Sequence, residues 1–494
     1  MYYLGLDIGS SSIKAALVHI ASGKSIGVVQ EPEIEMGIYA KQNGWAEQKP
    51  EDWWQHSCKA IKRLKEAHNI SSSQIKGIGI SYQMHGLVLI DKEGKVLRKS
   101  IIWCDSRAVE IGNSAFKSIG EEKCKAHLLN SPANFTASKL KWVKDNEPEL
   151  YQNIYKFMLP GDYVAYKFSN TVNTTISGLS EGVFWDFKEN TLADFLFKEY
   201  GIDKELVPDI VDTFALQSVV SAKGEQESGI AMGTPIYYRA GDQQNNALSL
   251  NVFEPGEVAG TGGTSGVIYA VTNNLSVKES SRINNFAHVN YHKNQDPRIG
   301  KLLCINGAGI QYRWLLNNLK VASYEEMNEL AAQVPIGADS VCMIPFGNGA
   351  ERILNNQDVG SRLVNINLNN HHKAHICRAA LEGIAFSFVY GMEILKSDGI
   401  EIKVLRVGND NLFRSSLFAN TVATLIGHEI EVFNTTGAIG AARAANLYKG
   451  DFNKFGASIM DNDHVMTVTP LADKTAYLAA YDIWKRELEL IINK

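Results

Sequence analysis

Apolar and polar positions along the chain predict strands and helices in regular succession. The first eighteen residues contain an apolar run over 2–6, a turn of small residues over 9–12 and a second apolar run over 13–18. This pattern is typical of a β-hairpin with a tight turn. Residues 258–272 repeat it as strand, Gly/Thr/Ser turn and strand, with the sequence VAGTGGTSGVIYAVT. The repeat predicts that the chain contains two similar halves.

The two hairpins align with Gly9-Ser10-Ser11 over Gly263-Thr264-Ser265 and with Ile13 over Val267. Asp7 ends the first apolar run, whereas Thr261 holds the same place in the second hairpin. Backbone N–H groups in such a turn can approach phosphate oxygens, and a nearby carboxylate can hold a hydrated Mg²⁺ ion. The pair therefore predicts two turns that close over one polyphosphate. The alternative is that each segment is only a hairpin turn, since Gly and Ser are common turn residues.

Further elements follow from the same kind of pattern. A helix is expected after Pro50, because Glu51 and Asp52 stand in its first turn and lysines gather near its end. Other helices are expected over 306–320, 373–395 and 437–447, and strands over 75–81 and 403–407. The helix over 437–447, GAIGAARAANL, carries so many small residues that it must pack closely against something. Alternating strands and helices predict an α/β fold.

The length of 494 residues is too great for one hydrophobic core. No segment rich in proline or serine separates the halves. We therefore expect two domains that share a cleft, residues 1–247 and residues 248–494.

Composition excludes several classes of protein. The net charge is −5 with no long basic run, so nucleic acid is not an expected partner. No apolar run approaches the ~18–20 residues of a membrane helix, and no secretory signal precedes the first strand, which predicts a cytoplasmic protein. The six cysteines are scattered without a CxxC pair, so neither a zinc site nor a disulfide framework is expected.

Two polar clusters stand where predicted strands end. Gln83-Met84-His85-Gly86 follows the strand over 75–81, and the segment from Trp103 to Arg107 follows a short apolar run. Ligands of α/β proteins collect at the ends of strands. Both clusters are therefore candidate parts of a binding site.

Asp242 is the candidate catalytic residue. It follows an apolar segment and Gly241, and the amides Gln243 to Asn246 come after it, which predicts a strand-to-helix junction. In that place Asp242 could act as a general base that takes the proton of a substrate hydroxyl during attack on a γ-phosphoryl group. The alternative is a simple helix N-cap, a position that aspartate favours.

Other motifs in the sequence give weaker indications of function. Gly23-Lys24-Ser25 ends like a phosphate-binding P-loop but lacks its first glycine, and we interpret it as a hairpin turn. Ser11-x-x-Lys14 lies on a predicted strand and has no companion motif of serine acyl-enzymes. For His371, His372 and His375 an exposed helix start is favoured over a metal site. Trp53 and Trp54 are expected in the core.

Six motifs occur in the order seen in the FGGY carbohydrate kinases, a family that the chain resembles over essentially its whole length. They are Asp7-x-Gly9-Ser10, Gln83-Met84-His85-Gly86, Trp103-x-Asp105-x-Arg107, Gly241-Asp242, Gly263-Thr264-Ser265-Gly266 and Gly440-Ala441-Ala442-Arg443. The resemblance implies two actin-like (ribonuclease H-like) domains with a nucleotide and sugar cleft between them. It also implies that ATP is held mainly by the second domain and the sugar by the first.

The resemblance assigns roles to the matching residues. Asp242 matches the catalytic base, and Asp7 matches the acid that helps to hold Mg²⁺ and ATP, with the metal bound through water. The expected sugar contacts are Gln83, Met84, His85, Trp103, Asp105 and Asp242. The expected ATP contacts are Gly9, Ser10, Ser11, Lys14, Gly263, Thr264, Ser265, Gly408 and Asn409. The adenosine loop that begins at Gly408 reads Gly-Asn-Asp-Asn, where the family usually has three glycines and an alanine.

Within the family, the segment over 83–86 is similar to that of xylulokinases, which implies ATP-dependent phosphorylation of D-xylulose. Three alternatives stay open: another ketose such as ribulose or sedoheptulose, a polyol such as glycerol, or a noncatalytic actin-like nucleotide switch. The expected partners are the sugar and ATP, with no membrane; a homodimer is an open expectation.

Overall fold

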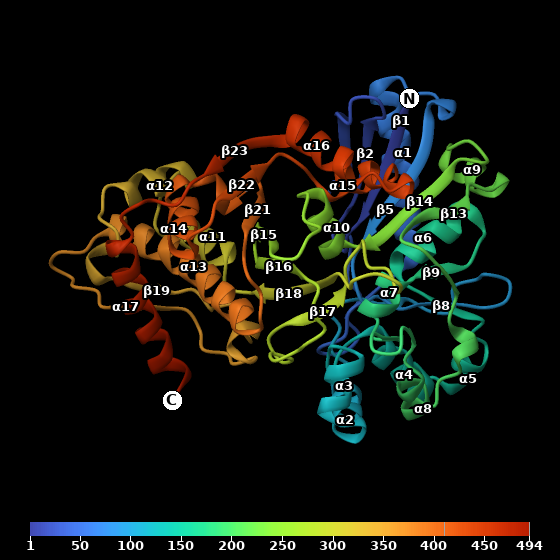
Figure 1. Cartoon of the computed structure of the whole chain (residues 1–494), viewed down its shortest axis with the longest axis horizontal. Coiled ribbons are helices and arrows are strands. Elements are labelled where there is room, and N and C mark those ends of the chain that lie inside the picture. The colour runs from blue at the N-terminus through green and yellow to red at the C-terminus, as the bar shows by residue number, and fades with distance from the viewer. Residues whose placement is uncertain (410, 494) are drawn as a thin grey trace.

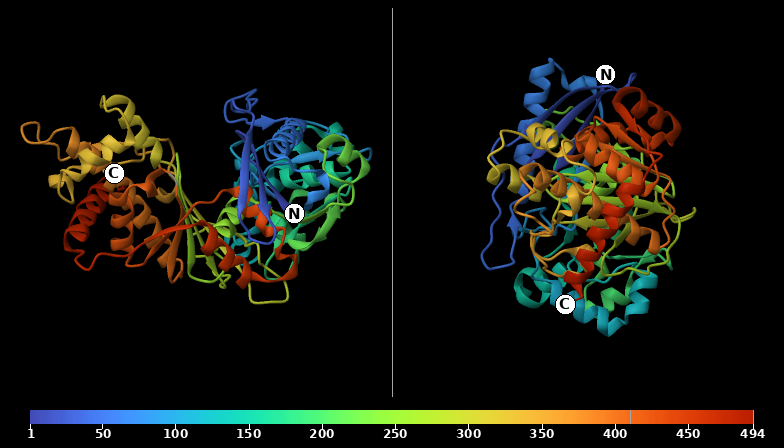
Figure 2. Two further views of the ribbon diagram at one scale, coloured as in Figure 1. Left: turned by 90° about the horizontal axis from the view of Figure 1, so that it is seen from above. Right: turned by 90° about the vertical axis from the view of Figure 1, so that its left-hand side faces the viewer.

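The computed structural model describes residues 1–409 and 411–493, and its core is two large mixed sheets, one in each half of the chain (Figure 1). The sheets lie in separate lobes when the molecule is seen from above (Figure 2). In spatial order, the first sheet contains β13 (Phe214–Val219), β14 (Pro235–Gly241), β5 (Ile75–Tyr82), β1 (Tyr2–Ile8), β2 (Ile13–His19) and β3 (Ser25–Glu31). The second contains β17 (Asn284–Ala287), β18 (Ile299–Ile305), β16 (Gly266–Thr272), β15 (Glu257–Gly262), β21 (Val404–Gly408), β22 (Ile430–Phe433) and β23 (His464–Val468).

The two sheets share one topology. In the first, β3, β2 and β1 are antiparallel neighbours, β5 and β14 continue parallel to β1, and β13 closes the edge antiparallel. In the second, β18, β16 and β15, then β21 and β22, then β23 follow the same order and directions. Strand β17 is an addition at one edge. The predicted α/β fold with two similar halves is confirmed.

The two predicted hairpins differ by one residue. The last pair before the first turn is Ile8 with Ile13, which leaves the four residues 9–12 in the turn. In the second hairpin the last pair is Gly262 with Gly266, which leaves only 263–265. Ile13 therefore corresponds to Gly266, and the predicted alignment of Ile13 with Val267 is wrong by one residue after the turn. Asp7 and Thr261 do correspond, as predicted.

Helices cover the sheets, and small two-stranded ladders join the loops. In the first half the helices are α1 (Pro50–His68), α2 (Val109–Ile119), α3 (Glu121–His127), α4 (Thr136–Asn146), α5 (Pro148–Gln152), α6 (Pro160–Ser169), α7 (Ile176–Glu181), α8 (Asp194–Tyr200), α9 (Ala222–Ser228) and α10 (Asp242–Ser249). In the second they are α11 (Gly309–Asn318), α12 (Tyr324–Ala332), α13 (Lys373–Ser397), α14 (Ser416–Ile426), α15 (Gly437–Ala444), α16 (Phe452–Asp463) and α17 (Thr475–Ile492). The ladders pair β4 (Glu47–Gln48) with β7 (Ser100–Ile101), β6 (Val88–Ile90) with β8 (Lys156–Met158), β9 (Asn173–Thr175) with β12 (Asp209–Val211), β10 (Trp185–Asp186) with β11 (Thr191–Leu192), and β19 (Cys342–Ile344) with β20 (Arg362–Val364).

Helix α1 forms for the reasons that its sequence indicates. Pro50 occupies its first turn, with Glu51 and Asp52 beside it, and Lys65 and His68 stand in its last turn. Acids near the start and bases near the end complement the helix dipole. Trp53 and Trp54 both lie in the buried core, as predicted.

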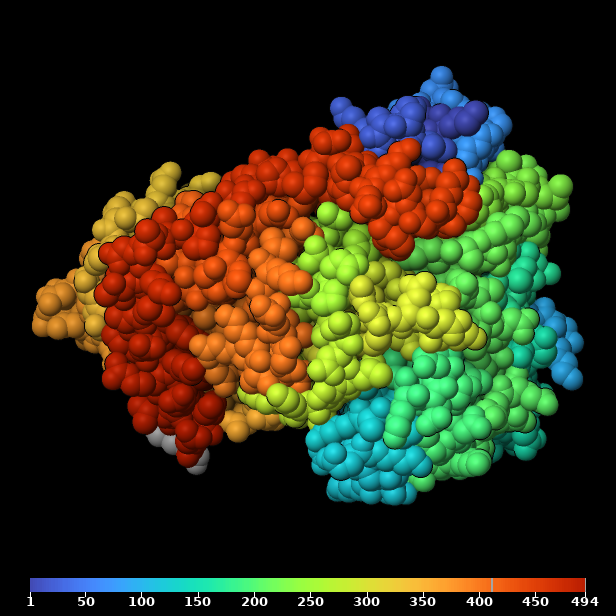
Figure 3. Space-filling view, viewed as in Figure 1, coloured from blue at the N-terminus to red at the C-terminus, as the bar shows by residue number. Residues whose placement is uncertain are grey.

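Helix α15 belongs to the second half of the sequence but packs on the first sheet, over β1, β5 and β2. A Cβ atom on Gly5 of β1 would lie 1.9 Å from the carbonyl oxygen of Ala438, and one on Gly79 of β5 would lie 1.9 Å from that of Ala441. The helix backbone therefore touches the sheet backbone, a contact that only glycine permits. This is the close packing that the run of small residues predicts, and in Figure 3 the red-orange atoms of the C-terminal part of the chain lie against the blue atoms of the N-terminal residues.

A second contact ties the halves together at β17. Asn130 donates from Nδ2 to the carbonyl of Asn285 (2.5 Å) and accepts from its N–H group (2.9 Å). The Oγ atom of Ser180 in α7 accepts from the N–H group of Ala287 (2.9 Å). The division at residue 247 stays a prediction, and α15 and β17 are two places where chain from beyond it is built onto the first half.

Replacing Gly79 by alanine tests the contact between helix and sheet. The added methyl group overlaps the Ala441 carbonyl, so α15 must move off the sheet, and we expect the free energy of unfolding to fall by about 1–3 kcal/mol. Urea unfolding followed by circular dichroism measures the change. Gly37→Ala is the matched control, because no atom lies within 4 Å of its added Cβ, and a change within about 0.5 kcal/mol is expected there. Equal stability of the two variants would contradict the close packing.

Candidate active site

The first sheet brings the two candidate carboxylates to one edge. Asp242 opens α10 directly after β14, whose last residue pairs with Tyr82 of β5. The register of β5 with β1 places Ser81 beside Asp7. The Oγ atom of Ser81 donates to Oδ1 of Asp7 at 2.9 Å. Asp7 and Asp242, far apart in the sequence, therefore lie at the same end of the sheet, in β1 and directly after β14, the two strands that flank β5.

Burial favours the neutral form of both acids. Burial first, and then the negative charge of Asp7, raise the pKa of Asp242 to about 7. Burial also raises the pKa of Asp7, although the hydrogen bond from Ser81 and the charge of Lys14 oppose the shift. Lys14 is the residue paired with Asp7 across the hairpin. A carboxyl group with a pKa near 7 is suited to general-base chemistry at neutral pH.

Both hairpin turns offer N–H groups toward ligands. In the first turn the N–H of Gly9 bonds to Ser12, whereas those of Ser10 and Ser11 have no acceptor in the described chain. The second turn likewise leaves its N–H groups without a described acceptor, while its carbonyls accept from Gly309 and Ile310 of α11. Clusters of free N–H groups at a tight turn are a common form of anion site.

A cavity of about 800 Å³ lies between the halves, beside these groups. Its first wall contains Met84, His85, Trp103, Asn134 and Phe135 from the first half. Asp242 and Gln243 lie at the junction. The second wall comes from the second half, and its members include Ser265, Asn284, Leu302, Cys304, Asn306 and Arg352. A ligand in this cavity would contact both halves of the chain.

His85 is held in one orientation. Its backbone is in the left-handed region with a φ of 60°, which is uncommon outside glycine and is typical of functional positions. Burial, and next the charge of Lys139, lower the pKa of the ring to about 3, so it is neutral at pH 7. Its Nδ1 lies 2.9 Å from the carbonyl of Glu181. Because a carbonyl only accepts, Nδ1 carries the hydrogen and Nε2 is free to accept one from a ligand.

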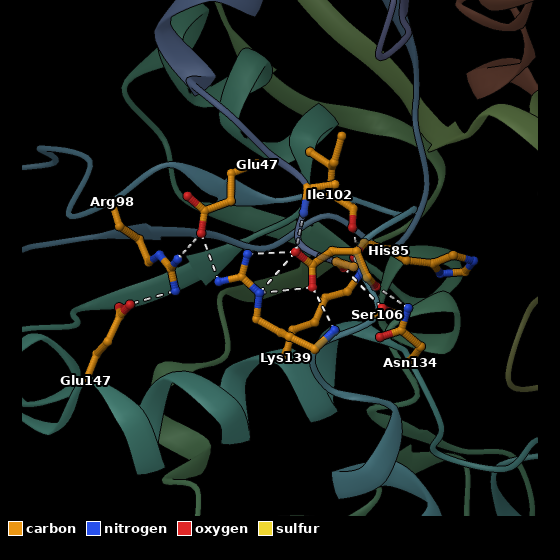
Figure 4. A network of polar contacts seen from close by, with 12 residues as sticks. Glu47, His85, Arg98, Ile102, Ser106, Asn134, Lys139 and Glu147 are labelled. Atoms are coloured by element: carbon orange, nitrogen blue, oxygen red, sulfur yellow. Dashed lines mark hydrogen bonds and ion pairs between the residues drawn. The ribbon is translucent and has the colours of Figure 1, made fainter. Parts of the chain in front are cut away.

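Lys139 in α4 fixes the two loops of the first wall (Figure 4). Its Nζ donates to the carbonyl of His85 and to that of Ile102, each at 2.9 Å. The side chain is fully buried, and burial lowers the pKa of its amine to about 7. Lys139 therefore sets the spacing between His85 and Trp103, the residue after Ile102.

The second turn and the predicted adenosine loop share an edge of the second sheet. Gly260 of β15 pairs with Val407 of β21, so the turn over 263–265 and Gly408 follow at the same end. The N–H of Asn409 bonds to the carbonyl of Phe433 at 2.7 Å. Asp410 of the predicted loop lies outside the described residues.

The chain matches two family models. Residues 2–249 match the N-terminal domain, and residues 258–448 the C-terminal domain, of the FGGY family of carbohydrate kinases. The chain belongs to the FGGY family of carbohydrate kinases. It is 27% identical over 462 residues to the xylulose kinase of Haemophilus influenzae, with 91% of each chain covered.

Solved structures show the same fold for this FGGY kinase. A xylulose kinase from Rhodospirillum rubrum has a TM-score of 0.88 at 23% identity, with 100% of both chains covered. The glycerol kinase of Plasmodium falciparum, solved with ADP, has a TM-score of 0.88 at 19% identity and covers 99% of this chain and 98% of its own. The predicted pair of actin-like domains and the identification as a carbohydrate kinase are confirmed.

Two predicted sugar contacts lie outside the cavity wall of this FGGY kinase. Asp105 is fully buried, and its carboxylate accepts from the N–H of Ala46 (2.5 Å) and from the backbone and guanidinium of Arg107 (2.6–3.0 Å). Gln83 is buried and donates from Nε2 to Gln48 at 3.3 Å. Both side chains support the loops that carry Met84 and Trp103. Trp103 itself is exposed in the cavity, with Nε1 at 3.4 Å from Oγ of Ser10 in the first turn.

The competing motifs serve structural roles. Gly23-Lys24-Ser25 belongs to the connection between β2 and β3, as predicted. His375 is buried, with Nε2 3.1 Å from Oδ2 of Asp339, so the expectation that all three histidines form an exposed helix start is wrong for this residue. In the described residues no group of three or more His, Cys, Asp or Glu side chains could hold a metal ion, and the six cysteines form no disulfide. None of the described helices is long and apolar enough to cross a membrane.

Three residues at or beside the cavity, Lys139, Glu181 and Arg352, were not predicted from the sequence. A Cβ on Gly241 would lie 2.6 Å from Oε2 of Glu181 and 2.6 Å from Cγ of Met84, so Glu181 stands directly behind the base. Burial first, and then the charge of Asp242, raise the pKa of Glu181, which favours its neutral form. All three residues come from segments with no family motif in our prediction. The sequence gives one indication for Lys139, because this charged residue stands next to the apolar Leu140 in a helical segment.

The variant Asp105→Asn separates a structural role from sugar contact. Among the described residues, the change leaves the buried guanidinium of Arg107 with Glu47 as its one acidic partner, and we expect the free energy of unfolding to fall by about 3–5 kcal/mol. Urea unfolding measures this. Asp145→Asn breaks an exposed pair with Lys141 and is the control, expected within about 0.5 kcal/mol. Normal stability with a weakened affinity for sugar would instead support a direct contact.

The raised pKa of Asp242 makes a prediction about stability. A carboxyl whose pKa rises from 3.8 to about 7 on folding costs stability as the pH increases through that interval. The neutral variant Asp242→Asn removes this cost, so its gain in Tm over the wild type should grow from pH 4 to pH 7 and stay level above it. Differential scanning calorimetry at several pH values measures the gain. The exposed Asp296→Asn should show no such dependence, and a pH-independent gain for Asp242→Asn would contradict the shift.

Proposed function

We propose that this kinase transfers the γ-phosphoryl group of ATP to the terminal hydroxyl of D-xylulose, giving D-xylulose 5-phosphate and ADP. The observation that carries the proposal is the position of Asp242, a carboxyl with a pKa of about 7 in the wall of the cavity that Met84 and His85 line. The name of the Haemophilus relative supports xylulose as the first sugar to test. A cytoplasmic location remains part of the proposal, and a homodimer remains a prediction.

Side chains of this protein bind the acceptor sugar and take the proton from its reacting hydroxyl group. Asp242 takes the proton of the terminal hydroxyl while that oxygen attacks the γ-phosphorus in line. The bond between the β-γ bridging oxygen and the γ-phosphorus breaks, and ADP leaves with that oxygen. His85 accepts a hydrogen bond at Nε2 from another hydroxyl of the sugar, which fixes the chain of the substrate relative to Asp242. The proton on Asp242 returns to water when the products depart.

The residues present also fit a divalent cation with ATP. Two carboxylates, Asp7 and Asp242, lie at the ends of the two strands that flank β5, the charge of Asp7 raises the pKa of Asp242, and a cation would relieve that repulsion. Oδ1 of Asp7 is occupied by Ser81, and a Cβ on Gly437 would lie 2.7 Å from Oδ2, so little space remains for direct coordination. These contacts favour Asp7 as a ligand through water. When bound, Mg²⁺ neutralises charge on the phosphate oxygens.

The two turns suit opposite sides of the polyphosphate. Ser10 and Ser11 present N–H groups beside Asp7, with Lys14 nearby, and Gly263, Thr264 and Ser265 present theirs from the second half. Gly408 and Asn409 follow at the same sheet edge as the second turn, and this position supports our proposal that the adenosine binds there.

A noncatalytic nucleotide switch is the alternative from another class. It has no need of an acid at the cavity or of the oriented His85 ring. Other ketoses and polyols differ from xylulose only in how they fill the cavity, so assays must rank them.

Asp242→Asn tests the base. We expect kcat for D-xylulose to fall about 10²–10⁴-fold, the usual contribution of a general base, while the Kd for the sugar changes little. A coupled ADP-release assay gives kcat, and calorimetry gives Kd. Asp296→Asn, on the exposed surface, should retain wild-type kinetics.

The same assay should be run on the wild type with xylulose, ribulose, sedoheptulose and glycerol. The highest kcat/KM is expected for xylulose. A flat response to all of them would favour the nucleotide switch, and near-normal turnover by Asp242→Asn would remove Asp242 from the role of base.

A further inference from the structure

Arg352 is a cation in the second wall of the cavity that has no acidic partner among the described residues. It opens the short turn Arg352–Leu354, and no described carboxylate oxygen lies within 4.0 Å of it. Its Nε donates to the carbonyl of Arg282 (3.2 Å) and its Nη2 to Oδ1 of Asn284 (2.5 Å). The guanidinium is thus anchored on one side by neutral groups alone.

The acid next to it in the sequence is used elsewhere. Glu351 is buried, and its two carboxylate oxygens accept from the N–H groups of Asn306 (2.9 Å) and Gly307 (3.0 Å). Burial raises the pKa of Glu351 to about 7, which further weakens its negative charge. It holds the loop before α11 and does not neutralise Arg352.

The free side of the guanidinium faces the sugar-binding wall. Nη1 has no acceptor in the described chain and is not enclosed by protein, so it is open to the cavity that His85 and Asp242 also line. The positive charge of Arg352 is among the influences that lower the pKa of His85, behind burial and Lys139. His85 and Arg352 therefore face one another from opposite halves of the chain.

A planar guanidinium with open N–H groups is best satisfied by planar oxygen acceptors. A carbonyl or carboxylate oxygen provides such an acceptor, whereas a hydroxyl is a weaker match for a charged donor. A structural brace would direct all its N–H groups to protein, which Arg352 does not.

We propose that Arg352 is a specificity-determining residue that donates hydrogen bonds to a carbonyl or carboxylate oxygen of the acceptor sugar. The inference rests on the proposed function, since it assumes that a sugar occupies this cavity. It deepens that proposal by selecting a class of substrate: an acceptor with a keto or acid group is favoured over the polyol of the same length. It also assigns part of sugar recognition to the second half of the chain.

The test compares Arg352→Gln and Arg352→Lys with the wild type on three five-carbon acceptors: D-xylulose, its polyol xylitol and the acid xylonate. Arg362→Gln is the matched control, because that arginine is exposed and its side chain bonds only to the carbonyl of Val359 in the described chain. The readouts are KM and kcat for each acceptor, the Kd for ATP, and sugar binding followed by the fluorescence of Trp103 in the cavity.

For Arg352→Gln we expect the KM for the preferred acceptor to rise about 10- to 100-fold, the range for loss of a charged hydrogen bond, with the Kd for ATP unchanged. The preference over xylitol should shrink by a similar factor, and Arg352→Lys should lie between. A preference for xylulose identifies the keto group as the acceptor of the bond, and one for xylonate identifies a carboxylate.

An unchanged preference over xylitol in both variants would overturn the inference. So would a fall in kcat at constant KM, which would place Arg352 on the phosphoryl group, or an equal loss of affinity for sugar and ATP, which would indicate a structural brace. Should Arg352→Gln fail to fold, Arg352→Lys alone decides, because a wild-type preference in it contradicts the need for a planar donor. A wild type inactive on every acceptor would instead contradict the proposed function.

Discussion

The structure depends on one contact, the backbone of α15 against the backbone of the first sheet. Gly5 and Gly79 leave room for the carbonyls of Ala438 and Ala441, and Gly440 meets Ser249 of α10 in the same way, since a Cβ there would lie 2.0 Å from Oγ. Asn245 of α10 donates to the carbonyl of Gly437 at 2.9 Å. Through α15, the start of α10 and the end of β1 are held at one fixed separation, and these carry Asp242 and Asp7.

Because this separation is fixed, the charge of Asp7 acts on Asp242 at a constant distance. Two carboxylates would move apart if the chain allowed it, but both are attached to strands that pair with β5 from its two sides. Burial raises the pKa of Asp242 most, and the repulsion from Asp7, which the fold retains, raises it further. The basicity of the site thus comes from burial first and from the fixed position of Asp7 second. The cavity wall formed by the second half lies where a ligand can contact both halves.

Local pattern predicted the parts of the fold that short-range chemistry determines: both hairpins, α1, α13 and the close packing of α15. It also indicated Met84, His85, Trp103 and Asp242, all of which line the cavity, because polar residues after apolar strands are visible in sequence. Roles that depend on distant partners are not visible in the sequence. The bond from Ala46 to the Asp105 carboxylate appears only in the fold, and a sugar contact by Asp105 stays a prediction. Arg352 resembles any surface arginine until the cavity is formed around it.

The placement of α15 also bears on how the chain folds during synthesis. The sheet of the first half is finished at β14, yet the helix that covers it lies about 200 residues further along the chain. At a translation rate of roughly 5–20 residues per second, the uncovered sheet would wait on the order of 10–40 s for its partner. During that time the glycines of β1 and β5 form an open groove on a nascent apolar surface. Because β1 and β5 are synthesised long before α15, this surface of the first sheet stays uncovered during that interval and is available to a chaperone.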